Sequence, residues 1–385
     1  MNISEKLNKL PPYLFAELDR KKEEVKKRGV DVISLGIGDP DIPTPEEVIE
    51  ALYEAALNPV NHRYPSYEGM IVLREKFAEW FKKRFGVNLD PEREVITLIG
   101  SKEGIAHLPL AVVNKEEYVL IPDPGYPVYY ASTIFADGLP FFMPLLKVNN
   151  FLPDLSSIPE KIVKKAKLMF INYPNNPTSA TAPLSFLQEL VRFALKNGII
   201  IASDAAYSEI FWNERPHSIL EVDGAMECAI EFHSLSKTFN MTGWRIGFAV
   251  GNREIVNALL RVKTNVDSGV FQAIQYAGIK ALEIYDRVSR QNREIYKKRR
   301  EILLRGIEKI GLNAHPSEAT FYVWLECPKG LSSMKMAEKC LEKGVLLTPG
   351  IGFGKYGDGF VRIALTVSEE RIEEACKRME DALKS

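Results

Sequence analysis

The chain has 385 residues, of which 46% are hydrophobic and 26% are charged, and its formal net charge is -1. A chain of this length exceeds what one hydrophobic core usually serves, so we expect two domains. The near-neutral charge gives no sign of a nucleic-acid or membrane partner, and the composition therefore indicates a protein that acts on small molecules.

The four cysteines, Cys228, Cys327, Cys340 and Cys376, are scattered without paired spacing. This pattern is typical of reduced thiols in a cytoplasmic protein rather than of a disulfide framework or a zinc site, so we expect no bound metal. The first residues lack the apolar core of a signal peptide, and no apolar run is long enough to span a bilayer. We therefore expect a cytoplasmic location.

The N-terminal segment reads as an arm followed by a charged helix, with Pro11 and Pro12 stiffening the chain just before Tyr13. A short strand and the turn Gly-Ile-Gly-Asp-Pro around Gly38 follow, where glycine lets the backbone approach a ligand closely. The turn is not a dinucleotide fingerprint, because the third glycine and the following helix are missing. A simple turn glycine is an equally good interpretation of Gly38.

Two predicted helices, at 45–57 and 70–85, flank a loop from Arg63 to Gly69 that is stiffened by proline and rich in tyrosine. Such a loop presents side chains, among them Tyr64 and Tyr67. Packing is the alternative interpretation for Tyr67.

An apolar strand over 94–100 is followed by a helix that begins at Ser101. A helix N-terminus offers unpaired N–H groups and a partial positive charge, so Ser101 and Lys102 form a candidate anion site. The next strand begins at Tyr118 and leads to the aromatic Tyr126. Apolar strands alternate with helices from about 45 to about 280, and this alternation predicts an α/β layer with a mostly parallel sheet and functional turns at its strand ends.

The segment from Gly198 to Tyr207 is a short apolar run that ends in Asp204, as a buried parallel strand with a functional residue at its carboxyl end would. A carboxylate there can pair with the ring N–H of a bound ligand, and Tyr207 can donate a hydrogen bond to a phenolate oxygen of that ligand. A plain helix N-cap is the alternative for Asp204.

The stretch from 233 to 247 places Lys237 between Ser234 and Ser236, eight residues before Arg245. Hydroxyls and an arginine can grip a phosphate beside a reactive amine. This combination indicates a cofactor with both a phosphate and an aldehyde, of which pyridoxal 5'-phosphate (PLP) is the obvious one, with Asp204 as the partner of its ring nitrogen. An ordinary loop lysine is the alternative.

A long polar helix is predicted from 281 to 310, and we interpret its basic run at 297–300 as a solvated face. A second, smaller α/β unit follows, with strands at 320–325 and 360–365. Arg362 lies in the middle of an apolar strand, where burial without an anion is costly. A carboxylate ligand is its natural partner, and a structural ion pair is the alternative.

Four motifs in this order, Asn176-Pro177-Thr178, Asp204 to Tyr207, Ser234 to Lys237 and Arg362, resemble the class I and II aminotransferases of PLP fold type I. The resemblance covers nearly the whole chain. The segments at 10–19, 64–69, 98–105, 172–179 and 231–237 look like the short prokaryotic LL-diaminopimelate aminotransferases.

The resemblance implies a large PLP-binding α/β domain over 45–285 with a mostly parallel sheet, and a smaller α/β domain over 286–385 to which the N-terminal arm, 1–44, contributes. It also implies a homodimer that transfers an amino group from LL-2,6-diaminopimelate to 2-oxoglutarate, yielding tetrahydrodipicolinate and glutamate in lysine biosynthesis. An aspartate or broad-specificity aminotransferase and a PLP-dependent lyase of the same fold are the alternatives. We expect no PLP-binding regulator, because a DNA-binding head has no room before Asp31.

The resemblance further implies individual roles. Lys237 would hold the cofactor and move the proton, supported by Asp204 and Tyr207. The cofactor would also be held by Ser101, Lys102, Tyr126, Asn176, Ser234, Ser236, Arg245 and, across the dimer interface, Tyr64. The substrate would be held by Tyr13, Gly38, Lys102, Tyr126, Asn176 and Arg362.

Overall fold

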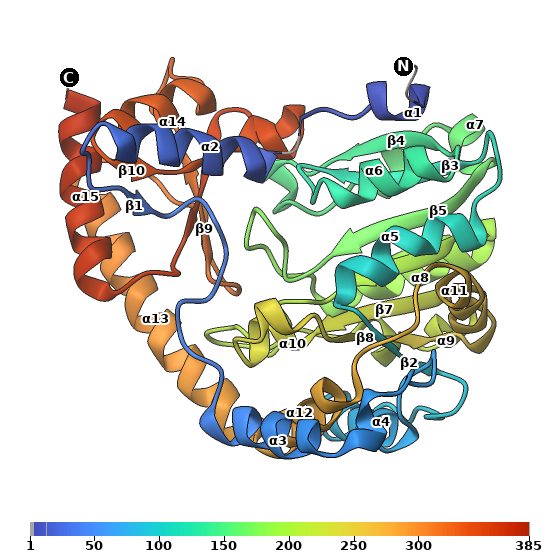
Figure 1. The fold of residues 1–385 in the computed structure, drawn as a ribbon. Coiled ribbons are helices and arrows are strands. Elements are labelled where there is room, and N and C mark those ends of the chain that lie inside the picture. Colours follow the sequence, from blue (N-terminus) through green and yellow to red (C-terminus); the bar gives the residue numbers. More distant parts are fainter. Residues whose placement is uncertain (1–3, 13, 385) are drawn as a thin grey trace.

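The computed structural model of the chain describes residues 4–12 and 14–384. Figure 1 shows a large part built around a broad sheet and a smaller part beside it, with the long helix α13 (Tyr285–Lys309) running from the bottom of the larger part up into the smaller one. Within the described residues, no helix is both long and apolar enough to cross a membrane.

Seven strands form the sheet of the larger part: β2 (Val95–Leu98), β3 (Tyr118–Asp123), β4 (Leu139–Pro144), β5 (Ala166–Asn172), β6 (Ile200–Asp204), β7 (Ala229–Ser234) and β8 (Gly247–Gly251). Their order is β2-β8-β7-β6-β5-β3-β4. The pairs from β7 to β4 are all parallel, and β8 is antiparallel to both of its neighbours. The prediction of an α/β fold with a mostly parallel sheet is therefore confirmed.

Helices cover both faces of this sheet: α5 (Ser101–Val112), α6 (Val128–Phe135) and α11 (Arg253–Val266) on one, and α4 (Ile71–Phe85), α8 (Leu184–Asn197) and α9 (Ala225–Cys228) on the other. Successive side chains of a strand point to opposite faces of the sheet. On β5, Leu168 and Phe170 therefore pack in the core under α5, α6 and α11, and Met169 and Ile171 pack in the core under α4, α8 and α9. Burial on both faces explains why these strands read as continuous apolar runs.

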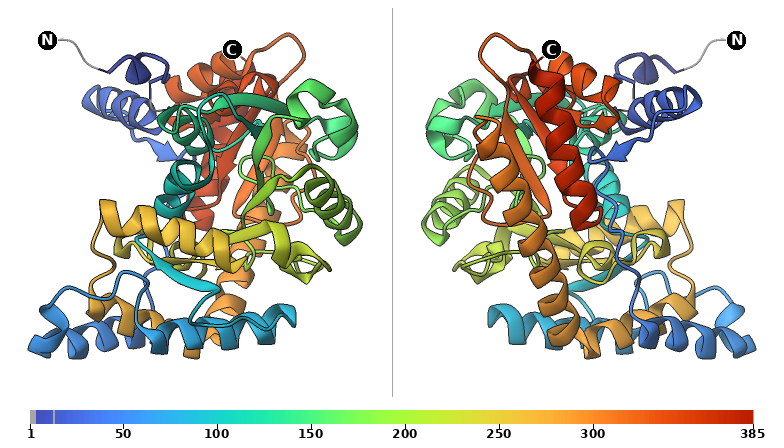
Figure 2. Two further views of the ribbon diagram at one scale, coloured as in Figure 1. Left: turned by 90° about the vertical axis from the view of Figure 1, so that its right-hand side faces the viewer. Right: turned by 90° about the vertical axis from the view of Figure 1, so that its left-hand side faces the viewer.

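Helices α3 (Glu46–Leu57) and α12 (Gln272–Glu283) pack against each other and with α4 form a layer at the bottom of Figures 1 and 2. The predicted helix from 281 to 310 is divided, because residues up to Glu283 belong to α12 and α13 begins at Tyr285. The remaining short elements are α1 (Glu5–Asn8), η1 (Pro59–His62), η2 (Lys147–Asn149), η3 (Leu155–Ser157), α7 (Glu160–Val163), η4 (Ile219–Glu221), α10 (Leu235–Thr238), η5 (Thr242–Trp244), η6 (Gly350–Phe353) and η7 (Lys355–Gly357).

The smaller part contains an antiparallel sheet in the order β11-β12-β9, built from β9 (Tyr322–Glu326), β11 (Thr348–Pro349) and β12 (Phe360–Ala364), with α2 (Leu14–Lys27), α14 (Ser333–Glu342) and α15 (Glu369–Lys384). Strand β1 (Ile33–Ser34) pairs in parallel with β10 (Val345–Leu346), so the N-terminal arm joins the C-terminal part. Ile33 and Leu35 share one buried core with Ile302 and Ile372. The domain boundaries at 44/45 and 285/286 stay predictions.

The interpretation of the basic run 297–300 as a solvated face is wrong at Arg299. This side chain is 7% exposed and forms a two-pronged ion pair with Asp41, at 2.6 and 2.8 Å. Because Asp41 lies just after the Gly38 turn, the pair fastens that turn to α13. Sequence periodicity could not reveal the contact, since the partner is far away in the chain.

Candidate active site

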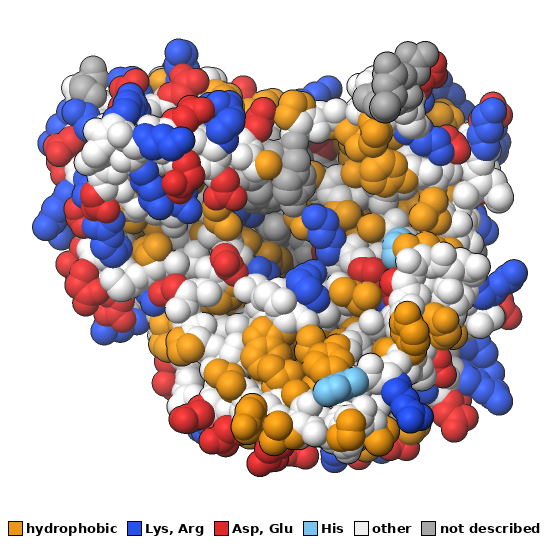
Figure 3. Space-filling model, viewed as in Figure 1, with side chains coloured by type: hydrophobic (Ala, Val, Ile, Leu, Met, Phe, Trp, Pro, Cys, Tyr) orange, Lys and Arg blue, Asp and Glu red, His pale blue; other side chains and the backbone are white. Residues whose placement is uncertain are grey.

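A cavity of about 230 Å³ lies at the carboxyl ends of β5, β6 and β7. In the space-filling view of Figure 3 the middle of this face is hollowed, with charged side chains around the hollow. Its lining includes these predicted site residues: Gly38, Ser101, Lys102, Tyr126, Asn176, Asp204, Tyr207, Ser234, Ser236, Lys237, Arg245 and Arg362. The edge at which they meet is the one where a parallel sheet is expected to carry its functional turns.

Two predicted site residues are not in this group. Tyr13 lies outside the described residues. Tyr64 does not line the cavity, and its side chain is 86% exposed. An exposed position is what a residue needs if it acts in the site of a partner subunit, and that role of Tyr64 stays a prediction.

One end of the cavity concentrates hydrogen-bond donors. A Cβ on Gly100, whose φ is +72°, would meet a guanidinium nitrogen of Arg245 at 2.3 Å, so this glycine permits both the turn and the approach of the arginine. Helix α5 starts at the next residue. At the end of the neighbouring strand β7, the Ser234 hydroxyl accepts the backbone N–H of Ser236 at 3.2 Å and so orders the turn before Lys237. A helix start, hydroxyls and a guanidinium are a donor set that fits a phosphate.

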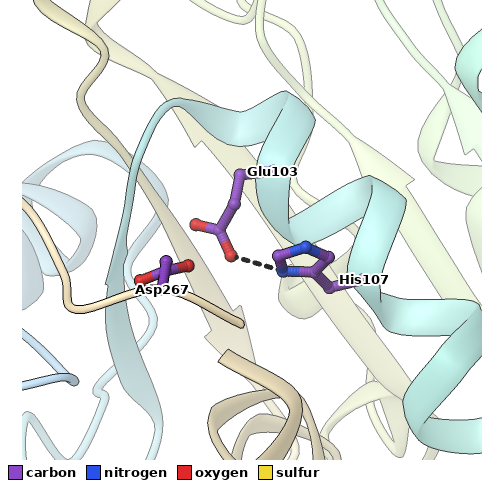
Figure 4. Close-up of side chains that lie close together, drawn as sticks. All are labelled: Glu103, His107 and Asp267. Carbon is purple, nitrogen blue, oxygen red and sulfur yellow. Dashed lines mark hydrogen bonds and ion pairs between the residues drawn. The ribbon is translucent and has the colours of Figure 1, made fainter. Parts of the chain in front are cut away.

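Behind the start of α5, Glu103, His107 and Asp267 lie within 4.8 Å of one another (Figure 4). The two carboxylates of this cluster are paired with the fully buried Lys263, whose ammonium donates to Glu103 at 3.3 Å and to Asp267 at 2.7 Å. Glu103 also accepts the backbone N–H of Ile99 at 3.0 Å. This cluster therefore anchors the first turn of the helix that faces the cavity.

Asp204 is the acidic group of the cavity, and it is 6% exposed. Its Oδ2 accepts the hydroxyl of Tyr129 at 2.7 Å, and its Oδ1 accepts the backbone N–H of Ala206 at 3.3 Å. Burial raises the pKa of Asp204 to about 6, and the Tyr129 hydrogen bond opposes the rise. The N-cap alternative for Asp204 is wrong, because the residues directly after β6 form turns and not a helix.

Lys237 lies in the single turn of α10, and its ammonium donates to the Gly38 carbonyl at 2.7 Å. Burial lowers its pKa to about 8, helped by the charges of Arg362 and Arg245 and opposed by that of Asp39. Near neutral pH such a lysine has a much larger neutral fraction than an ordinary lysine, whose pKa is 10.5, and the neutral amine is the nucleophilic form.

Arg362 is 1% exposed on β12. Its guanidinium donates to the Asn176 side-chain oxygen at 2.7 Å and to the Gly36 carbonyl at 2.6 Å, and it lies 4.1 Å from the centre of the Tyr322 ring. Two neutral oxygens and a ring face thus hold the guanidinium fork in one orientation. The arrangement therefore suits a carboxylate ligand.

Sequence analysis missed several cavity residues. Tyr322 of β9 is 2% exposed, and its hydroxyl lies 3.0 Å from that of Tyr207. It had no local signal, because only the packing of the two parts brings β9 to the cavity. Asn172 had a local signal, because it is the polar residue that ends the apolar run of β5, as Asp204 ends that of β6, and the structure pairs the two residues. The other missed residues are Ile37, Ile105, Ala206 and Thr242.

Residues 30–379 match the profile of the family described as aminotransferase class I and II. The chain belongs to this family. A relative in Aquifex aeolicus, named LL-diaminopimelate aminotransferase, is 56% identical over 98% of each chain. One of the same name in Moorella thermoacetica is 52% identical over 100% of this chain and 99% of its own. The solved structure of a Thermus thermophilus aspartate aminotransferase single mutant superposes with a TM-score of 0.93 at 30% identity, covering 99% of this chain and 100% of that one.

As a class I and II aminotransferase, the chain is an enzyme that transfers amino groups between amino acids and 2-oxo acids. The family resemblance inferred from the motifs around Asn176, Asp204, Lys237 and Arg362 is thereby confirmed, as is the likeness to LL-diaminopimelate aminotransferases. The roles of the individual residues stay predictions.

Proposed function

We propose that this aminotransferase moves an amino group from LL-2,6-diaminopimelate to 2-oxoglutarate, yielding tetrahydrodipicolinate and glutamate in lysine biosynthesis. The observation that carries the proposal is the identity of 52–56% over nearly the whole chain to relatives named LL-diaminopimelate aminotransferase. Aspartate aminotransferase is the alternative, since an enzyme of that name shares the fold at a TM-score of 0.93.

We propose PLP as the cofactor because the cavity lining fits it. Among the described lining residues, four side chains are cationic, Lys102, Lys237, Arg245 and Arg362, and one, Asp204, is acidic. This excess of positive charge suits a ligand pair that carries a phosphate and a carboxylate. When bound, PLP supplies an electron sink for the substrate α-carbon. Tyr126, half-buried in the lining, offers an aromatic face for the ring.

Different residues of the cavity have separate roles in binding the cofactor. The helix start at Ser101 and Lys102, the Ser234 and Ser236 hydroxyls and Arg245 bind the phosphate. Asp204 keeps the ring nitrogen protonated, because an ionised carboxylate stabilises an adjacent N–H⁺.

The amine of Lys237 first holds the cofactor and then moves the proton at the substrate α-carbon. The Tyr207 hydroxyl and the Asn176 amide nitrogen donate to the phenolate oxygen of the ring. Arg362 binds the α-carboxylate and so fixes the angle of the α-carbon's C–H bond to the ring, which favours transamination over decarboxylation. Lys102, Tyr13 and the backbone of Gly38 are the proposed contacts for the rest of the substrate.

We further propose that the enzyme is a homodimer with Tyr64 reaching the phosphate site of the partner subunit. Figure 3 shows hydrophobic side chains gathered on the lower part of the face that carries the hollow. The exposed large apolar side chains of α3, of η1 and of α12 with the residue just before it are Tyr53, Leu57, Val60, Phe271 and Tyr276. A contiguous exposed apolar patch on a soluble protein marks an interface. Tyr64 lies at the edge of this region in sequence, just after η1.

Complementation tests the shared site. Lys237→Ala and Tyr64→Ala subunits are each expected to be inactive or nearly so as homodimers. When they are mixed and exchanged, one of the two sites in each hybrid combines Lys237 with a partner's Tyr64, and activity is expected to return. Absence of recovery in hybrids that size-exclusion chromatography shows to be dimeric would contradict the shared site.

The substrate proposal is tested by following glutamate formation from a panel of amino donors with 2-oxoglutarate. We expect kcat/KM to be highest for LL-diaminopimelate. A far higher value for aspartate would make the chain an aspartate aminotransferase. Release of pyruvate and ammonia without glutamate would favour a PLP-dependent lyase instead.

A further inference from the structure

We propose that Tyr129 is a positioning residue that keeps Asp204 ionised and holds its carboxylate in one orientation toward the proposed cofactor site. The inference rests on the proposed role of Asp204. Tyr129 is fully buried and does not itself line the cavity, yet its hydroxyl donates to Asp204 Oδ2 at 2.7 Å. It therefore acts on the cavity only through Asp204.

The Tyr129 side chain is held from several sides. Its ring stacks on Phe170 of β5, with centroids 4.8 Å apart and planes at 18°. It also meets the ring of Tyr126 edge to face, with centroids 5.9 Å apart. The hydroxyls of Ser132 and Thr133 donate to its backbone carbonyl at 3.1 and 2.8 Å. Because α6 and β5 both fix this ring, the direction from which its hydroxyl reaches Asp204 is fixed as well.

The Tyr129 hydroxyl keeps its proton in this position and so can donate to the ionised Asp204. Burial first, and then the negative charge of Asp204, raise the pKa of Tyr129 well above its usual value, so the phenol keeps its proton. A hydrogen bond to the charged form of a carboxylic acid favours that form. Tyr129 thus offsets part of the cost of burying the Asp204 charge.

Two other titratable groups interact electrostatically with Asp204: His233 on β7, whose ring packs among the aromatic side chains of α4, and Tyr207 in the turn after β6. The His233 ring is engaged with the buried Glu231 at 2.8 Å. The Tyr207 hydroxyl lies against that of Tyr322 and not against the Asp204 carboxylate. In the described part of the chain, Tyr129 and the backbone N–H of Ala206 are the donors to this carboxylate, and the bond from Tyr129 is the shorter.

The test compares Tyr129→Phe with Tyr285→Phe. Tyr285 is the matched control, because it is also a buried tyrosine whose hydroxyl donates to a buried carboxylate, that of Glu209, outside the cavity lining. Both changes delete one hydroxyl and keep the ring. If Tyr129 only packs the core, the two variants should behave alike in every assay.

We expect Tyr129→Phe to lower kcat by about ten- to hundredfold, since a hydrogen bond to a charged group is lost. KM is expected to stay nearly constant, and the acidic limb of the kcat profile is expected to move to higher pH. An independent readout is the affinity of the apoprotein for PLP, followed by tryptophan fluorescence across pH. Its acidic limb should move in the same direction in Tyr129→Phe and not in Tyr285→Phe.

A double-mutant cycle with Asp204→Asn completes the test. In the Asp204→Asn background, adding Tyr129→Phe should change kcat by less than about twofold, because the charge that Tyr129 serves is gone. Incorporation of 3-fluorotyrosine at position 129 keeps the ring and the hydroxyl but makes it a stronger donor, and it should move the acidic limb to lower pH. This variant keeps the test decisive if Tyr129→Phe folds poorly.

The inference would be overturned if Tyr129→Phe and Asp204→Asn had additive effects on kcat. It would also be overturned if the acidic limb of the kcat profile moved in neither the phenylalanine nor the fluorotyrosine variant. Failure of the proposed function has a different signature. If Asp204→Asn itself lowers kcat by less than tenfold, the role of Asp204 is wrong, whatever Tyr129 does. A donor other than LL-diaminopimelate would leave the inference about Tyr129 intact.

Discussion

The Arg362 guanidinium donates to the side-chain oxygen of Asn176 at 2.7 Å, and this bond joins β12 of the smaller part to the turn after β5 of the larger one. A proposed carboxylate-binding group is thus oriented by a proposed cofactor-binding group. The contact couples the two halves of the cavity, so a change in one is expected to disturb the other.

Replacement of Arg362 by lysine tests this fork. Lysine is a point charge that cannot bond both Asn176 and the Gly36 carbonyl while facing a carboxylate. Losing one partner of a buried charged contact costs about 2–5 kcal/mol, so kcat/KM should fall by at least about thirtyfold, chiefly through KM. Steady-state kinetics with Arg290→Lys, an exposed position on α13, serve as the control. An unchanged KM would remove Arg362 from the substrate site.

The variant Lys237→Ala is expected to lose turnover but still bind PLP, because the donors around Ser234 and Arg245 and the carboxylate of Asp204 remain. Borohydride reduction followed by mass spectrometry should find the cofactor attached to Lys237 in the parent protein and unattached in the variant. Near-normal activity of this variant would refute the assigned role of the lysine.

Asp204→Asn keeps the shape of the side chain and removes the charge proposed to hold the ring nitrogen protonated. A loss of several orders of magnitude in kcat is expected, with a circular dichroism spectrum like that of the parent protein. A loss below tenfold would mean that Asp204 has only a structural role.

The rate at which the apoprotein takes up PLP should depend on pH through Lys237. Its pKa of about 8 lies below the ordinary value of 10.5, so the fraction of the neutral, reactive amine increases as the pH rises toward 8, and this form predominates above pH 8. Asp39 raises this pKa, and therefore Asp39→Asn should shift the midpoint of the stopped-flow rate profile to lower pH. A shift to higher pH, or no shift, would contradict the electrostatic assignment.

Gly38→Ala should destabilise the protein, because the added methyl group would overlap the Tyr322 side chain. The added Cβ would lie 1.9 Å from the Tyr322 hydroxyl, and Tyr322 is buried against Arg362, so it cannot swing away freely. Overpacking of this kind costs about 1–3 kcal/mol, measurable by urea unfolding of the apoprotein. Gly243→Ala is the control, because its Cβ would meet nothing within 4 Å, and a change below about 0.5 kcal/mol is expected. Equal stability of both variants would contradict the overlap.

Those parts of this enzyme that depend on short segments could be predicted from its amino-acid sequence. Alternating strands and helices predicted the mostly parallel sheet. Asp204 at a strand end and Lys237 between two serines were recognisable as candidate site residues because the signal for each lies in the residues next to it in the chain. These local patterns are set by the period of a strand and by turn chemistry, and both can be read along the chain.

The distant groups that complete the site could be identified only in the folded structure. Tyr322 meets Tyr207, Arg299 binds Asp41 and Tyr129 reaches Asp204 through contacts between segments 75 to 258 residues apart. A buried tyrosine or arginine looks like any other in sequence, because its partner is chosen by how two packed layers meet. The same packing lowers the pKa of Lys237 and raises that of Asp204, since both shifts arise mainly from burial that no single segment can provide.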